Sequence, residues 1–161
     1  MLNAHVHDDE RHLLAAIELA RRARSNGNHP FGALLADAGG NVLLEAENTV
    51  VTGRDATGHA ETNLVRMASE RFDADYLRHC TLYTSTEPCA MCAGAIYWAD
   101  VRRVVFALSN EELRRITVSN PDNVHLGISC RKIFARGDYP VEVSGPHLTE
   151  QARAVHEGFW G

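Results

Sequence analysis

Two cysteines separated by two residues, Cys89 and Cys92, restrict the possible folds of this chain more than any other part of its sequence. They stand at the start of an apolar stretch, residues 90–98, whose composition predicts a helix. The unpaired N–H groups at a helix start lower the pKa of a thiol and favour the thiolate that a metal requires. A cysteine pair in this position can therefore bind one metal ion, provided that the fold brings a further ligand from elsewhere in the chain.

That further ligand is expected from His59, which stands in the sequence His59-Ala60-Glu61. Two sulfur ligands and one nitrogen ligand suit zinc. A structural zinc site commonly has four protein ligands, whereas three leave a position for water, as in a catalytic site. We therefore expect one Zn²⁺ ion per chain, bound by His59, Cys89 and Cys92, with Glu61 as the acid and base beside its water. Residues 59 and 61 do not share a helix face, so they can converge only if a helix begins there.

Two other interpretations of the cysteine pair are open at this point. The pair could be a redox centre, although a proline precedes it and the His-x-Glu sequence is also present. The zinc site could instead be purely structural, and a fourth ligand would then have to come from Cys80, Cys130 or His79. A disulfide framework is not expected, because the first eleven residues do not resemble a secretion signal.

The composition is that of an ordinary globular protein, with 45% hydrophobic and 23% charged residues among 161. We expect a single domain over residues 1–161. Sixteen basic against 21 acidic residues give a net charge of −5, which argues against a nucleic acid and for a small molecule as the partner. No apolar run approaches the roughly 18 residues of a membrane-spanning helix. We therefore expect a cytoplasmic protein without membrane contact.

The hydrophobic periodicity predicts helices and strands in alternation after an initial helix and hairpin. The expected helices are residues 9–25, 59–70, 90–98 and a last one from residue 149 that ends in the aromatic residues Phe159 and Trp160. The expected strands are residues 31–36, 42–46, 80–85, 103–108 and 141–143. Residues 109–134 show no clear pattern. This order predicts an α/β protein with helices packed on both faces of a mixed sheet.

The chain resembles the cytidine deaminase superfamily of zinc hydrolases, whose signature is His-x-Glu followed by Pro-Cys-x-x-Cys. Within that superfamily it is most similar to bacterial guanine deaminases and other nucleobase deaminases, and it is also similar to tRNA adenosine deaminases. The segments that carry the resemblance are residues 30–33, 48, 57–61, 83–89 and 92–99. The resemblance implies a three-layer α/β/α sandwich around a mixed five-stranded sheet, one zinc per chain and a homodimer. Residues 109–134 depart from the guanine deaminase pattern.

The resemblance also implies hydrolytic deamination of a free nucleobase, with Glu61 moving protons and guanine as the first candidate substrate. Cytosine, isoguanine and amino-triazines are alternatives with the same chemistry, and a tRNA adenosine is an alternative that requires a nucleic-acid partner. A zinc-stabilised binding module without turnover is an alternative of another class. By resemblance, the residues expected to contact the substrate or cover its pocket are Phe31, Asn48, Ala60, Asp122, Phe159 and Trp160.

Overall fold

The computed structural model describes residues 3–161, and side chains from residue 8 onward. Five strands form one sheet in the order β2-β1-β3-β4-β5. The strands are β1 (Gly32–Ala36), β2 (Val42–Glu47), β3 (Thr81–Thr86), β4 (Arg103–Leu108) and β5 (Glu142–Ser144). The helices are α1 (Asn3–Ser25), α2 (Ala60–Arg71), α3 (Ala74–Leu77), α4 (Ala90–Trp98), α5 (Asn110–Thr117), α6 (Cys130–Phe134) and α7 (Thr149–Ala154).

The sheet is mixed, as the alternation of elements predicted. Strand β1 pairs antiparallel with both β2 and β3, whereas β3, β4 and β5 run parallel to one another. Helix α4 makes the crossover between the parallel strands β3 and β4, so it begins at the carboxyl end of β3. Ligand sites of open α/β sheets lie at this edge, where the strands end and the crossover helices begin.

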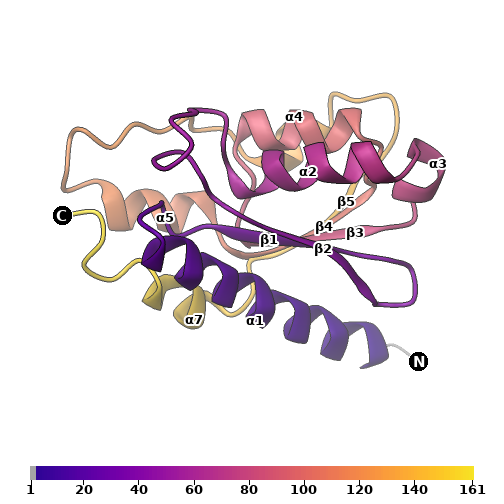
Figure 1. Ribbon diagram of the computed structural model, residues 1–161, viewed down its shortest axis with the longest axis horizontal. Coiled ribbons are helices and arrows are strands. Elements are labelled where there is room, and N and C mark those ends of the chain that lie inside the picture. Colours follow the sequence, from indigo (N-terminus) through magenta and orange to yellow (C-terminus); the bar gives the residue numbers. More distant parts are fainter. Residues whose placement is uncertain (1–2) are drawn as a thin grey trace.

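Helices cover both faces of the sheet, which confirms the predicted three-layer α/β/α architecture (Figure 1). Residues of α2, α4 and α6 pack on one face, and residues of α1 and α7 pack on the other. Neighbouring residues of β3 point to opposite sides, as in any strand. Leu82 belongs to the core beneath α2 and α4, whereas Tyr83 belongs to the core beneath α1.

Two predictions about the elements need correction, and the stretch without a predicted pattern contains two helices. The first helix begins at Asn3 rather than at residue 9. Residues 109–134 contain the two short helices α5 and α6, each of which starts after a serine whose side chain accepts a backbone N–H of the first turn. The last helix ends at Ala154, so Phe159 and Trp160 lie in the turns that follow it, where Gly158 has φ +69°.

Across the described residues, we find no helix that combines the length and the apolar character needed to cross a membrane.

Candidate active site and metal centre

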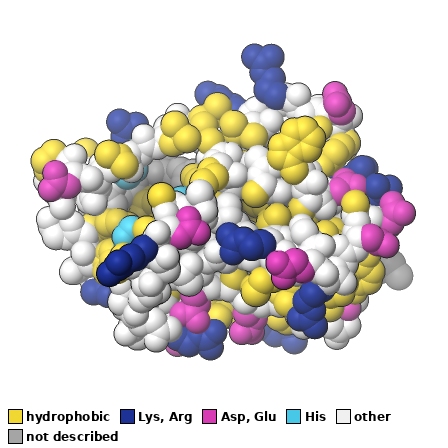
Figure 2. All heavy atoms as spheres, turned by 45° about the horizontal axis from the view of Figure 1, so that its top comes forward, with side chains coloured by type: hydrophobic (Ala, Val, Ile, Leu, Met, Phe, Trp, Pro, Cys, Tyr) yellow, Lys and Arg dark blue, Asp and Glu magenta, His cyan; other side chains and the backbone are white. Residues whose placement is uncertain are grey.

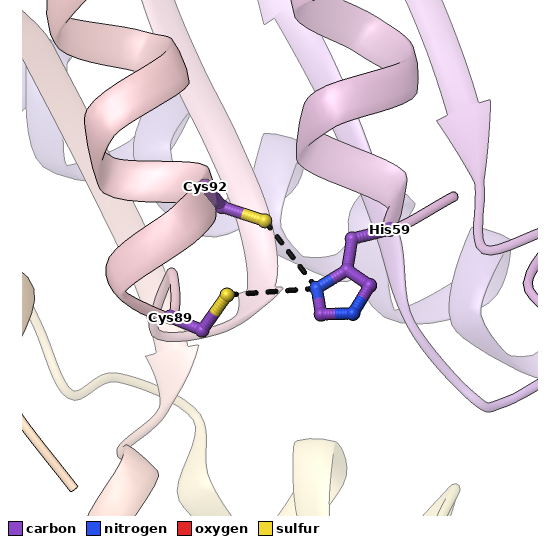
Figure 3. A group of neighbouring side chains, drawn as sticks. All are labelled: His59, Cys89 and Cys92. Carbon is purple, nitrogen blue, oxygen red and sulfur yellow. Dashed lines mark hydrogen bonds between the residues drawn. The ribbon is translucent and has the colours of Figure 1, made fainter. Parts of the chain in front are cut away.

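Two helix starts bring the three expected zinc ligands together (Figure 3). His59 is the residue immediately before α2, Cys89 is the residue immediately before α4, and Cys92 lies in the first turn of α4. The His59 Nδ1 atom lies 3.5 Å from the Sγ atom of each cysteine. All three ligand atoms lie within 4.8 Å of one another.

This arrangement fits one zinc ion. A nitrogen and a sulfur ligand at ordinary distances from one zinc, separated by the tetrahedral angle, stand about 3.6 Å apart. The two Nδ1–Sγ distances of 3.5 Å agree with that value. Among the residues whose side chains are described, only these three form such a group. Cys80, Cys130 and His79 do not join it, so the structural-site interpretation lacks the fourth ligand that it needs.

Of the three ligands, Cys89 is the one already held in its metal-binding form, whereas its hydrogen bond with Cys92 and burial raise the pKa of Cys92. The hydrogen bond with Cys92 holds the pKa of Cys89 down at about 4, and the hydrogen bond with His59 adds to this effect. The same contact with Cys89 raises the pKa of His59. Cys89 is therefore a thiolate near neutral pH, which is the form that binds zinc.

Glu61 stands in the first turn of α2 with its side chain in the interior, only 5% exposed. Its Oε1 atom lies 2.5 Å from the hydroxyl oxygen of Thr84 on β3. Burial raises the pKa of the Glu61 carboxyl group, and the negative charge of nearby Cys89 raises it further. Because α2 starts at Ala60, His59 and Glu61 both belong to the start of this helix, which is the condition for their side chains to converge.

Comparisons with known proteins agree with this site. Residues 6–108 match the family model of the cytidine and deoxycytidylate deaminase zinc-binding region. The chain belongs to this deaminase family. A probable cytosine deaminase from Schizosaccharomyces pombe is 44% identical over 153 residues, which are 94% of this chain and 92% of that protein.

Two guanine deaminases are also similar to this deaminase. The one from Bacillus subtilis is 40% identical over 104 residues, covering 64% of this chain and 66% of that protein. The solved structure of the one from Nitrosomonas europaea has a TM-score of 0.72 at 27% identity, covering 89% of this chain and 80% of that chain. The chain is therefore a zinc-dependent hydrolase that deaminates substrates of nucleobase type.

Aromatic rings from two distant parts of the deaminase, residues 29–31 and 156–160, meet in one cluster. The ring centroid of Phe31 lies 5.5 Å from that of His156 and 6.1 Å from that of Trp160. The centroid of His29 lies 5.9 Å from that of Phe159 and 5.5 Å from that of Trp160. The structure thus brings together three residues expected at the pocket, Phe31, Phe159 and Trp160, and adds two histidines.

These two histidines were missed in the sequence. Burial lowers the pKa of His29, and the charge of His59 lowers it further. His156 is 1% exposed, and burial lowers its pKa to about 4. Its neutral Nδ1 accepts a hydrogen bond from Trp160 Nε1 at 3.0 Å. The position of His29, directly before Pro30 and Phe31, could have pointed to it, whereas nothing in the sequence pointed to His156.

The other expected contact residues are differently placed. Asn48 follows β2, is 1% exposed, and accepts the N–H of Val50 through its amide oxygen at 3.0 Å. Ala60 is fully buried in the first turn of α2. Asp122 lies exposed in a turn, where its N–H donates to the side chain of Asn120. It is Asn120 that reaches the aromatic tail, because its Nδ2 atom donates to the carbonyl oxygen of Trp160 at 3.3 Å.

Glu87, two residues before Cys89, is a further residue missed in the sequence. Its buried carboxylate accepts the N–H of Asn110 at 3.2 Å and the N–H of Cys130 at 3.0 Å. These are the first residues of α5 and α6, so one carboxylate caps two helix starts, where negative charge is favoured. Glu87 thereby fixes the first residue of α5 and the first residue of α6 to the cysteine-bearing loop.

Proposed function

We propose that this chain catalyses the hydrolytic deamination of a free nucleobase, with guanine converted to xanthine and ammonia as the first reaction to test. The observation that carries the proposal is the buried Glu61 carboxyl group beside a group of three metal ligands. In this proposal His59, Cys89 and Cys92 hold zinc, and Glu61 moves the protons. A site of three protein ligands is the type that catalysis uses.

The proposed reaction replaces the exocyclic amine of the base by an oxygen from water. Bound zinc would supply the Lewis acid that makes water reactive near neutral pH. Glu61 would take a proton from the attacking water and pass it to the neighbouring ring nitrogen. It would then take the second proton from the hydroxyl group added to the ring carbon and give it to the amine, which leaves as ammonia. One carboxyl group can serve these steps because each proton that it accepts is later released. Such transfers contribute about 10²- to 10⁴-fold to the rate.

The pocket proposed for the base is bordered by the aromatic rings. Figure 2 shows a hollow on this side of the molecule, with histidine side chains at its edge and apolar side chains around it. We propose that Phe31 borders the planar ring of the base and that Phe159 and Trp160 cover it. The amide of Asn48 and the N–H of Ala60 would hydrogen-bond its polar edge. We keep Asp122 as a proposed contact for a bound base, although its turn is exposed.

Cytosine is the second candidate substrate. Guanine is supported by the two guanine deaminases, one of which matches over most of both chains as a structure. Cytosine is supported by the Schizosaccharomyces pombe relative, which is similar over nearly the whole length of both proteins. A deaminase for isoguanine or an amino-triazine would use the same site chemistry.

Ammonia release from a panel of substrates tests this proposal. The zinc-loaded protein is assayed with guanine, cytosine, isoguanine, adenine, ammeline, guanosine, cytidine, adenosine and a tRNA. We expect rapid release from one free base, with guanine ahead of cytosine. Release from cytosine alone would overturn the choice of guanine and keep the reaction. Release from tRNA alone, or from no substrate by a fully zinc-loaded protein, would overturn the proposal.

Two further alternatives are less well supported. A tRNA adenosine substrate calls for a basic surface, and the net charge of −5 argues against one. A binding module without turnover would need its zinc closed by a fourth protein ligand. Within the part of the chain whose side chains are described, the group stops at three.

We also propose that the enzyme is a homodimer that works in the cytoplasm, where thiols stay reduced and can bind zinc. Support for the dimer comes from α4, whose outer face carries Met91, Gly94, Ala95 and Trp98 at helical spacing. The Trp98 side chain is 84% exposed, and a Cβ atom added at Gly94 would meet open space. A second copy would present the same apolar face across a two-fold axis.

Replacing Trp98 by glutamate is expected to shift a dimer toward monomer, because two charges would have to be buried at a symmetric contact. The mass in solution is measured by light scattering after size exclusion. Val51→Glu is the matched control, because Val51 is 52% exposed in a loop away from α4. A wild-type monomer, or a Trp98→Glu variant that remains a full dimer at low concentration, would contradict this interface.

A further inference from the structure

The Thr84 hydroxyl group is held in one place by the centre of the sheet. Thr84 lies opposite Ala33 of β1 on one side and opposite Phe106 of β4 on the other, and its side chain is fully buried. A β-branched side chain in a strand has restricted rotation about its first torsion. The hydroxyl oxygen also lies 3.0 Å from the carbonyl oxygen of Thr86 in the same strand. Its position is therefore set by the sheet and not by the site.

Glu61, in contrast, reaches this contact through a flexible side chain. It leaves the first turn of α2, and three torsions separate its backbone from its carboxyl group. Its Oε1 atom lies 2.5 Å from the hydroxyl oxygen of Thr84, a short distance typical of a strong hydrogen bond to a carboxyl group. Thr84 is thus the rigid partner in this contact, and it fixes the direction of the Glu61 carboxyl group.

We infer that Thr84 is a positioning residue for the reaction, which holds the Glu61 carboxyl group in the orientation needed to exchange protons with water and base. The inference rests on the proposed role of Glu61. Thr84 itself touches neither the metal ligands nor the proposed base, and it acts only through the carboxyl group. Catalytic proton transfer needs its partners within hydrogen-bond reach, so a carboxyl group that turns away spends less time in the productive geometry.

The same strand supplies a matched comparison. Thr86 follows Thr84 by two residues, so both side chains leave the same face of β3. Both are buried, at 0% and 3% exposure. The Thr86 hydroxyl group finds no hydrogen-bond partner among the described residues. Removing the Thr84 hydroxyl group loses one hydrogen-bond contact within β3 and the contact with Glu61, whereas removing the Thr86 hydroxyl group loses neither.

The experiment uses the zinc-loaded enzyme and its best substrate from the panel. Thr84→Val is expected to lower kcat about 10- to 100-fold, the loss typical of one strong hydrogen bond to a charged group. KM and zinc content are expected to stay near the wild-type values, and Tm is expected to fall by a few degrees because buried hydrogen bonds are lost. Thr86→Val is expected to keep kcat within about twofold. A second pair of variants, Thr84→Ser and Thr84→Ala, tests the hydroxyl group separately from side-chain size, because both lack the methyl group of threonine and only serine keeps the hydroxyl group. Thr84→Ser is expected to retain most of the activity that Thr84→Ala loses.

The outcomes separate this inference from the function on which it rests. If Glu61→Gln is inactive while Thr84→Val and Thr84→Ala keep wild-type kcat, the positioning role is wrong and the proposed function stands. Equal losses in Thr84→Ser and Thr84→Ala would also overturn the inference, because the hydroxyl group would then be irrelevant. If Glu61→Gln remains active, the proposed role of Glu61 fails first, and the positioning role fails with it.

Discussion

We expect that replacing Glu61 by glutamine lowers kcat by about 10²- to 10⁴-fold and leaves zinc binding intact. The glutamine amide has nearly the volume of the carboxyl group, so the buried space beside Thr84 stays filled. Its oxygen can still accept the hydrogen bond of the Thr84 hydroxyl group. It can neither take up a proton from water nor release one to the base, and this chemical difference accounts for the whole loss.

Steady-state kinetics and zinc analysis of the same preparation measure both parts of this prediction. Glu70→Gln is the matched control, since Glu70 lies exposed on the same helix and far along it from the ligands. It removes one negative charge from α2 and is expected to retain full activity. A Glu61→Gln enzyme with a near-normal rate would exclude Glu61 as the proton carrier, and loss of its zinc would show that the glutamate serves the metal site instead.

Replacing Cys92 by alanine has the second large effect, because it removes one of three ligands from the metal centre. We expect the zinc content to fall from about one per chain toward zero, since two ligands leave zinc too weakly bound. Activity should fall with it to the background rate. A strong chelator is expected to lower the Tm of the wild-type enzyme, because zinc stabilises the folded state that binds it. The same chelator should leave the Tm of the variant unchanged.

Cys130→Ala supplies the control for cavity formation. Cys92 and Cys130 are both fully buried cysteines near helix starts, but Cys130 lies outside the ligand group. Burial raises the pKa of the Cys130 thiol to about 12, so it remains protonated. We expect Cys130→Ala to retain zinc and a Tm that responds to the chelator. Full zinc content in Cys92→Ala would contradict the ligand set.

The metal centre could be predicted from the sequence because each part of it is local. The two cysteines share one helix turn, and His59 and Glu61 share another. The contact between these two helix turns is the one long-range feature of the centre. The alternation of strands and helices already predicted the sheet edge at which the two turns lie. The boundaries of α4, residues 90–98, follow from the same local pattern and agree with the structure.

The pocket wall could not be predicted in this way, because distant contacts create it. Phe31 and Trp160 lie far apart in the sequence. They meet because α7 ends at Ala154, before Trp160 is reached. Helices α5 and α6 are short, and their starts are stabilised by caps that include the remote Glu87 carboxylate. His156 is not part of any sequence motif that indicates a functional residue. Its contact with Trp160 is a single hydrogen bond that only the structure shows.

The two backbone N–H groups that share the Glu87 carboxylate give this enzyme a way to diversify. The segment from Asn110 to Cys130, which includes the whole of α5, begins and ends at the same carboxylate. Residues 118–129, the loop between α5 and α6, therefore follow and precede elements whose first residues are fixed, and insertions or exchanges within this loop would leave the turn with Cys89 and Cys92 in place. Evolution, or a protein engineer, can therefore vary this loop without rebuilding the reactive centre.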